Sequence, residues 1–183
     1  MMRVFLISLP FAVVPFTIGC AATKTVSDPA ARDRMLALLL PMKIEIVAPF
    51  TRVKSFDDDS TPDGIELWLQ AVNSLGNTGL NIVGSLRAEL YEYVPASAEH
   101  KGRRLEQWKI ELATPADQRA YWSDLTRMYE FRLMIDPVTV PKARQYVLAV
   151  TYTTPLGEHL TDECVLTYDV GLSLTPGAVG GPG

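Results

Sequence analysis

The chain has 183 residues, of which 48% are hydrophobic and 21% charged, an ordinary composition for one globular domain. Its formal net charge of -4 gives no electrostatic basis for a nucleic-acid partner, which usually needs a basic surface. It has only two cysteines, Cys20 and Cys164, so a framework of several disulfides is excluded.

The amino terminus has the organisation of a secretory signal. Arg3 supplies one positive charge, and residues 4–19 follow without a charged side chain. This run is shorter than the ~20 apolar residues that span a bilayer. It also contains Pro10 and Pro15, which are unfavourable inside a helix. We therefore expect residues 1–19 to be a signal peptide that is removed.

The apolar run ends in Thr17-Ile18-Gly19-Cys20, which resembles the lipobox of bacterial lipoproteins. The usual form is Leu-Ala/Ser-Gly/Ala-Cys, so Ile18 and Gly19 fit, whereas Thr17 departs from the preferred leucine. In that family the chain is cut before the cysteine, whose thiol receives a diacylglycerol, and the new amino group is often acylated. The resemblance implies cleavage between Gly19 and Cys20, with Cys20 as the lipid attachment site. Two or more acyl chains hold a protein at a membrane where one chain would not.

The same resemblance implies a location at the cell envelope. Ala21 follows Cys20, in place of the aspartate associated with inner-membrane retention in some bacteria. This favours the outer membrane if the cell has one, and otherwise the outer face of the cytoplasmic membrane. Two alternatives stay open, namely an ordinary signal peptide and an uncleaved anchor with an incidental cysteine.

Residues 20–41 are expected to form a lipidated tether followed by a short helix. Asp28-Pro29 is typical of a helix start, with an N-cap and a proline at the first position, and Pro41 ends the pattern. We expect the apolar half of this helix to pack on the domain. At the other end of the chain, residues 173–183 cannot bury apolar surface and are expected to be disordered.

Between residues 42 and 172 apolar and polar residues alternate with the period of a β-strand. About seven such stretches are separated by loops rich in Gly, Pro and Asp. This pattern predicts an all-β domain, a two-sheet antiparallel sandwich of the immunoglobulin-like or C2-like kind. One stretch, residues 144–154, is apolar on both faces, as a central strand would be. The stretches are residues 42–48, 65–72, 82–94, 107–113, 128–135, 144–154 and 159–170.

One interruption of the strand pattern is helical. Thr114 is a suitable N-cap, Pro115 suits the first helical position, and Asp117 is an acid at the third. Apolar residues then fall at helical spacing at Tyr121, Trp122 and Leu125. We expect a helix of one to three turns that caps one end of the sandwich.

The densest acidic stretch, residues 56–64, offers carboxylates at Asp57, Asp58, Asp59 and Asp63. These oxygens could bind calcium, but the stretch is not an EF-hand, because Gln70 occupies the position of the bidentate glutamate. Turn chemistry alone explains the residues, since Pro62-Asp63-Gly64 sets a bend before the next strand. We therefore expect a solvated turn and no metal site.

Three basic residues lie close together in the loop at residues 95–106, namely Lys101, Arg103 and Arg104. They could contact phosphate head groups, but they are fewer than the clusters that recognise lipids. A solvated hairpin tip is the favoured interpretation.

Trp68, Tyr91 and Tyr93 fall on the polar faces of strands that we expect to be adjacent. Exposed aromatic rings could stack on sugar rings. Alternatively, the amino-terminal helix covers them or they pair across the strands, which is the interpretation we favour because large apolar patches are rarely left bare.

Cys164 shares the apolar face of its strand with Leu166, so we expect a small buried hydrophobe. His159 falls on the opposite strand face and His100 in the basic loop, so neither is placed to activate the thiol. The chain also lacks Gly-x-Ser-x-Gly, His-Glu-x-x-His and a glycine-rich phosphate loop. We expect no enzyme and no cofactor.

The domain behind Cys20 resembles, in organisation and not in motif, the small uncharacterised β-sandwich domains that follow lipoboxes in many bacterial envelope proteins. We therefore expect a lipid-anchored envelope protein whose non-enzymatic sandwich binds another envelope protein. The first alternative is a carbohydrate- or calcium-dependent recognition module, and the second is an unrecognised envelope enzyme.

Overall fold

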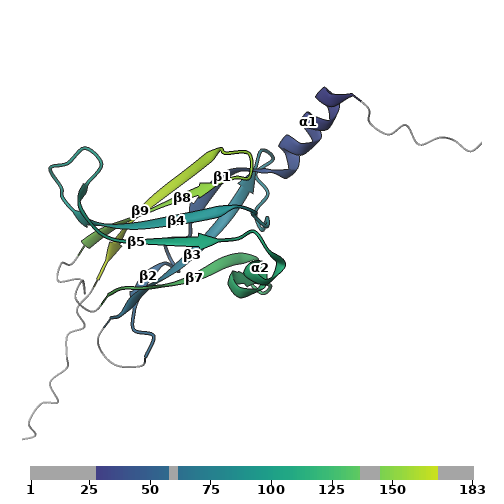
Figure 1. The fold of residues 1–183 in the computed structure, drawn as a ribbon. Helices are drawn as coiled ribbons and strands as arrows, with labels where there is room; N and C mark the ends of the chain where they lie inside the picture. Colours follow the sequence, from purple (N-terminus) through teal and green to yellow (C-terminus); the bar gives the residue numbers. More distant parts are fainter. Residues whose placement is uncertain (1–27, 58–61, 137–144, 169–183) are drawn as a thin grey trace, which may run out of the picture.

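A computed structural model describes residues 28–57, 62–136 and 145–168 of the chain. These residues form two antiparallel β-sheets that pack face to face, together with two short helices (Figure 1). The fold class predicted from the sequence, an all-β two-sheet sandwich, is therefore confirmed. The expected signal peptide at residues 1–19, Cys20 and the expected disordered tail at residues 173–183 lie outside the described residues, so these predictions stay untested.

The first sheet has the strand order β1-β3-β7-β6. Strand β2 pairs with the first residues of β3, on the same side of β3 as β1, which pairs with its last residues. Its strands are β1 (Pro41–Ile46), β2 (Arg52–Lys54), β3 (Gly64–Asn73), β6 (Trp122–Ser123) and β7 (Met128–Met134). The second sheet has the order β5-β4-β8-β9. Its strands are β4 (Ser85–Tyr93), β5 (Lys101–Glu111), β8 (Gln145–Thr153) and β9 (His159–Thr167).

The core lies between the two sheets and follows the alternation in the sequence. In β3, Leu67 and Leu69 are fully buried between the sheets. In β8, Tyr146, Val147 and Leu148 are buried in succession, so this strand is buried on both faces. Its position between β4 and β9 confirms the central strand predicted from its two apolar faces.

Helix α1 (Pro29–Leu39) begins where the sequence predicts, because the Asp28 carboxylate accepts a hydrogen bond from the Ala30 N–H at 3.0 Å. The expectation that its apolar half packs on the domain is wrong. The helix leaves one end of the sandwich (Figure 1), and Leu39 is 69% exposed. The Asn73 side chain at the end of β3 donates a hydrogen bond to the Leu38 carbonyl at 3.0 Å.

Helix α2 (Pro115–Tyr121) has the predicted capping box, in which Thr114 and Asp117 each accept a hydrogen bond from the other's backbone N–H. It lies at the same end of the sandwich as α1 (Figure 1). One part of the prediction is wrong, because the helix ends at Tyr121 and Leu125 lies in the turn that follows β6.

A part-buried group of hydrogen bonds around Gln118 connects α2 to both sheets. The Gln118 amide donates hydrogen bonds to the carbonyls of Ile82 and Leu112, at 2.7 and 2.8 Å. The Tyr129 hydroxyl donates a hydrogen bond to the side-chain oxygen Oε1 of Gln118 and accepts one from the Ile82 N–H. These bonds satisfy backbone groups where the chain crosses between the sheets.

Candidate interaction site

The strand registers bring several chain connections together at one end of the sandwich, which we call the α1 end. In the first sheet Pro41 pairs with Asn73, so the start of β1 meets the end of β3. In the second sheet Ser85 pairs with Thr153, so the start of β4 meets the end of β8. The α1 end therefore comprises α1, the chain between β3 and β4, α2, the β6–β7 turn and the β8–β9 turn.

Exposed apolar side chains are concentrated at the α1 end. The described residues include thirteen large hydrophobic side chains that are exposed. Six of them lie on α1 or directly after it, namely Met35, Leu36, Leu38, Leu39, Leu40 and Met42. Four lie on the connections, namely Leu75, Val83, Leu125 and Leu156. The other three are Phe50, Met134 and Val165. A monomer rarely exposes a large apolar area without a binding role, so this end is the principal candidate interaction site.

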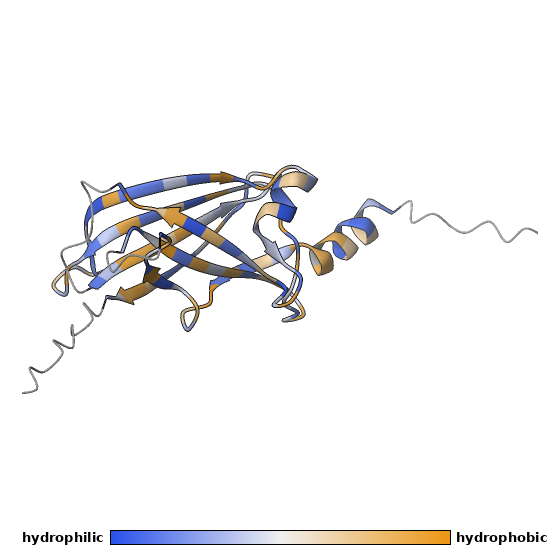
Figure 2. Cartoon of the chain, turned by 90° about the horizontal axis from the view of Figure 1, so that it is seen from below, coloured by the Kyte–Doolittle hydropathy of each residue, from blue (hydrophilic) through white to orange (hydrophobic). Residues whose placement is uncertain are grey.

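The apolar part of α1 runs from Met35 to Leu39, and Figure 2 shows by hydropathy that the helix is apolar next to the sandwich. Leu36 and Leu40 line a groove of about 610 Å³ together with Met42, Leu156 and Leu160. The groove thus joins α1 to the β8–β9 turn. The earlier part of the helix carries exposed charges at Arg32, Asp33 and Arg34.

The turns that carry Leu125 and Leu156 are held by local hydrogen bonds. The Arg127 N–H donates to the Ser123 carbonyl at 2.7 Å, which closes the β6–β7 turn. The Gly157 N–H donates to the Thr154 carbonyl at 2.9 Å, which closes the β8–β9 turn. Leu125 is 94% exposed and Leu156 is 75% exposed, so each projects from an ordered turn into solvent.

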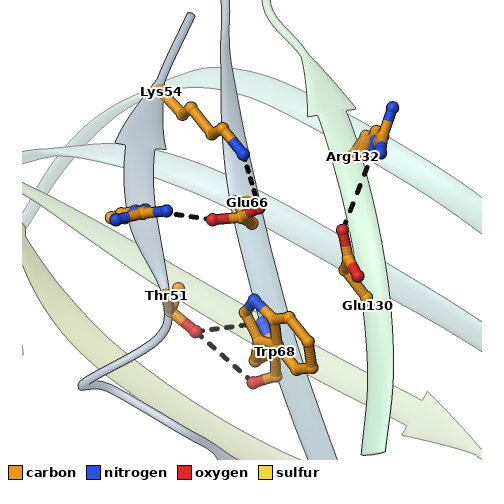
Figure 3. A network of polar contacts seen from close by, with 7 residues as sticks. Thr51, Lys54, Glu66, Trp68, Glu130 and Arg132 are labelled. Carbon is orange, nitrogen blue, oxygen red and sulfur yellow. Dashed lines mark hydrogen bonds and ion pairs between the residues drawn. The ribbon is translucent and has the colours of Figure 1, made fainter. Parts of the chain in front are cut away.

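A second surface lies on the outer face of the first sheet, around Trp68 (Figure 3). Glu66, two residues before Trp68, is buried under two cations. Its carboxylate accepts hydrogen bonds from Arg52 at 3.0 Å and from Lys54 at 2.8 Å. On the neighbouring strand, Arg132 and Glu130 lie across from Glu66 and Trp68 respectively. We call these residues, with Phe50 and Phe56, the Trp68 face.

Burial alone would raise the pKa of Glu66, because desolvation disfavours the carboxylate. The hydrogen bonds from Lys54 and Arg52, and the charges of both, outweigh that effect and leave the pKa below its ordinary value. Sequence reasoning missed this cluster because it missed β2. The available signal was the alternation in Arg52-Val53-Lys54, which puts both cations on one strand face.

The structure separates the three aromatic residues that the sequence placed on adjacent strands. Trp68 lies in the first sheet, whereas Tyr91 and Tyr93 lie in the second, so that expectation is wrong. Their partners differ too. The Trp68 ring packs against Phe50 with ring centroids 5.8 Å apart, and Tyr93 stacks on His100 at 5.3 Å.

The three basic residues expected in a loop lie instead in strand β5, and the connecting hairpin comprises residues 94–100. Each is paired with a carboxylate. Lys101 contacts Glu163 and Glu99, Arg103 contacts Glu92, and Arg104 contacts Glu89. Paired cations are less available to phosphate groups than a free basic cluster would be.

Two of the four acidic residues in the stretch at 56–64 lie within the described residues. The Asp63 carboxylate accepts a hydrogen bond from the Phe56 N–H at 2.9 Å, a bond that closes the turn. The Asp57 carboxylate accepts from the Ser55 hydroxyl at 2.9 Å. Asp58 and Asp59 lie outside the described residues, so the absence of a calcium site stays a prediction.

Cys164 lies on the inner face of β9 and packs against the core, half-buried. Burial raises the pKa of its thiol to about 12, and the charges of Asp162 and Glu163 act in the same direction. His159 is on the other face of the strand, as predicted, with its Nδ1 3.0 Å from the Thr153 hydroxyl. The thiol is thus placed as a small hydrophobe.

Within the described residues, no helix is long and apolar enough to cross a membrane. Comparisons of the chain with protein-family models, with curated proteins and with solved structures find no match. The fold and its surfaces therefore define the protein as an all-β two-sheet sandwich with an apolar α1 end and a charged, aromatic Trp68 face.

Proposed function

We propose that the protein is a lipid-anchored bacterial envelope protein whose β-sandwich is a non-enzymatic interaction domain. The observation that carries the proposal is Ile18-Gly19-Cys20 at the end of the uncharged apolar run at residues 4–19. In this account residues 1–19 are removed, Cys20 is lipidated, and the sandwich stands on the outer side of the membrane that holds the lipid.

The arrangement of the folded part supports this proposal. Helix α1 begins at Pro29, only nine residues after Cys20. A lipid on Cys20 would hold the α1 end near the membrane and leave the Trp68 face and the second sheet free for a partner. The partner proposed is another envelope protein.

Metabolic labelling with a palmitate analogue tests the anchor. The wild type and Cys164→Ala are expected to be labelled and to sediment with membranes, whereas Cys20→Ala is expected to lose the label and the sedimentation. Cys164→Ala is the matched control because the chain has only these two cysteines. Equal labelling of Cys20→Ala and the wild type contradicts the proposal.

A second candidate function, carbohydrate recognition, is favoured by the Trp68 face. Trp68 and Phe50 present aromatic surface beside the paired charges of Arg52, Lys54 and Glu66. Aromatic rings bordered by hydrogen-bonding groups are suited to a polar ligand that has an apolar face, such as a sugar ring. A glycan array probed with the wild type and Trp68→Ala tests it. Binding that Trp68→Ala abolishes supports this function, and an array without signal contradicts it.

A further inference from the structure

We infer that the α1 end is a lipid-binding surface, on which the apolar carboxy-terminal part of α1 and the leucines of the adjacent turns contact the bilayer directly. The inference rests on the proposed function for the position of the tether. It goes further by assigning a role to the folded domain, which then has a fixed orientation on the membrane instead of moving freely at the end of its tether.

The distribution of exposed apolar residues is the first argument. Ten of the thirteen large hydrophobic side chains that are exposed in the described residues lie at the α1 end. Among the residues that the structure describes at the opposite end, two are exposed and large, Met134 and Val165, each about half exposed. The apolar surface is therefore a property of the end from which the chain runs to Cys20.

The length of the tether is the second argument. From Cys20 to Pro29 the chain has nine residues, which span at most about 30 Å when fully extended. Strand β3, with ten residues, is about 33 Å long, and α1 projects outward from its end (Figure 1). The opposite end of the sandwich thus lies beyond the reach of a short tether, whereas the α1 end lies within it.

The chemistry of the surface favours lipid over a protein partner. Leu75, Leu125 and Leu156 project singly from three different connections, and Leu39 is exposed on the helix. Separate apolar tips can each enter the soft boundary between head groups and acyl chains, whereas a protein partner needs a continuous complementary surface.

The charges at the α1 end include both signs. Exposed Arg32 and Arg127 are accompanied by exposed Asp33 and Glu158. Within the part of this end that the structure describes, no excess of cations indicates a site for anionic lipid. Binding is therefore expected on vesicles of phosphatidylcholine alone, with little change on adding salt.

An environment-sensitive fluorophore attached to single cysteines tests the inference. In a Cys164→Ala background, the full mature chain carries Leu156→Cys or Leu39→Cys at the α1 end, with Met134→Cys as the matched control at the opposite end. Each is measured with and without phosphatidylcholine vesicles that contain a nitroxide quencher in the acyl chains. The acylated protein and an unacylated Cys20→Ser form are both used.

The expected result is brighter, lipid-quenched emission from positions 156 and 39 and unchanged emission from position 134, in both forms. The inference is overturned if acylated protein binds vesicles but the emission from position 156 is no more quenched than the emission from position 134. The lipid anchor would still stand in that case. Bright emission from position 156 in the absence of vesicles, together with a dimer in sedimentation, would assign the surface to a second copy of the chain. That result would also overturn the inference. Failure of Cys20 to be acylated in cells concerns the proposed function alone, because the Cys20→Ser form still tests the surface.

Discussion

The carboxylate of Asp162 in β9 accepts a hydrogen bond from the backbone N–H of Ile46 in β1, at 2.7 Å. These strands are the edges of two different sheets, so the bond joins the sandwich where its two layers meet. It also provides a partner for an edge-strand N–H, which would otherwise be available to another chain. Cys164 lies two residues further along the same face of β9.

Substitution Asp162→Ala is expected to lower the free energy of unfolding by about 1–3 kcal/mol, because the N–H of the buried Ile46 loses its acceptor. Asp162→Asn retains a carbonyl oxygen and is expected to cost less. Denaturant unfolding of the two variants makes the comparison. Equal stability of Asp162→Ala and the wild type would mean that water or the backbone replaces the carboxylate.

The Glu66 cluster is expected to make stability depend on pH. The pKa of Glu66 is lowered from its ordinary value of 4.5, so its contribution is present above that value and is lost as the pH falls through the folded-state pKa. Glu66→Gln is expected to cost about 1–2 kcal/mol at pH 7, toward the lower end because Arg52 is largely exposed. The difference from the wild type should shrink below pH 4.5.

The matched control is Glu130→Gln on the same sheet face. Its ion pair with Arg132 is long, at 3.9 Å, and the Arg132 side chain is mostly exposed. A much smaller loss of stability is expected for this variant. If both glutamine variants lose the same amount across the pH range, the burial of Glu66 has no special role.

Cys164 is expected to react slowly with thiol reagents in the folded protein. Burial raises its pKa to about 12, so the reactive thiolate is scarce at neutral pH. Labelling should accelerate strongly once the chain is unfolded by denaturant. Cys164→Ser is expected to cost about 1–3 kcal/mol, since a hydroxyl enters an apolar site. Rapid labelling of the native protein would contradict this placement.

The acidic stretch is expected to hold no tight calcium site. Asp63 already accepts a local backbone hydrogen bond, and the position of a bidentate glutamate is occupied by Gln70. The thermal unfolding temperature should therefore be the same in millimolar calcium as in a chelator. A tight site would add about 2.7 kcal/mol at a hundredfold excess over its dissociation constant. A large upward shift that Asp63→Asn removes would establish such a site.

The sequence predicted the strands and helix starts that depend on the local pattern of residues. Period-two alternation identified the long strands, and Thr114 with Asp117 identified the start of α2. Pairing between distant strands was not predictable, because alternation tells which face is buried and not which strand is the neighbour. The placement of Trp68 and Tyr91 in one sheet failed for that reason.

The same limit applies to the surfaces. The short strand β2 has three residues, so the alternation in Arg52-Val53-Lys54 is only a weak strand signal, and without β2 the burial of Glu66 was not anticipated. The apolar residues of α1 were visible in the sequence, but burial against the domain is the usual fate of such residues. Their exposure depends on the angle at which α1 leaves the sandwich, which no local pattern encodes (Figure 1).

The mass of the amino-terminal peptide from the membrane-bound protein shows directly whether Cys20 is the lipidated first residue. The expected mature chain begins at Cys20 and carries a diacylglycerol on the thiol. Base treatment, which cleaves ester-linked acyl chains, should reduce the mass accordingly. A mature chain that begins elsewhere, or that begins at Cys20 with a free thiol, would rule out lipidation at Cys20.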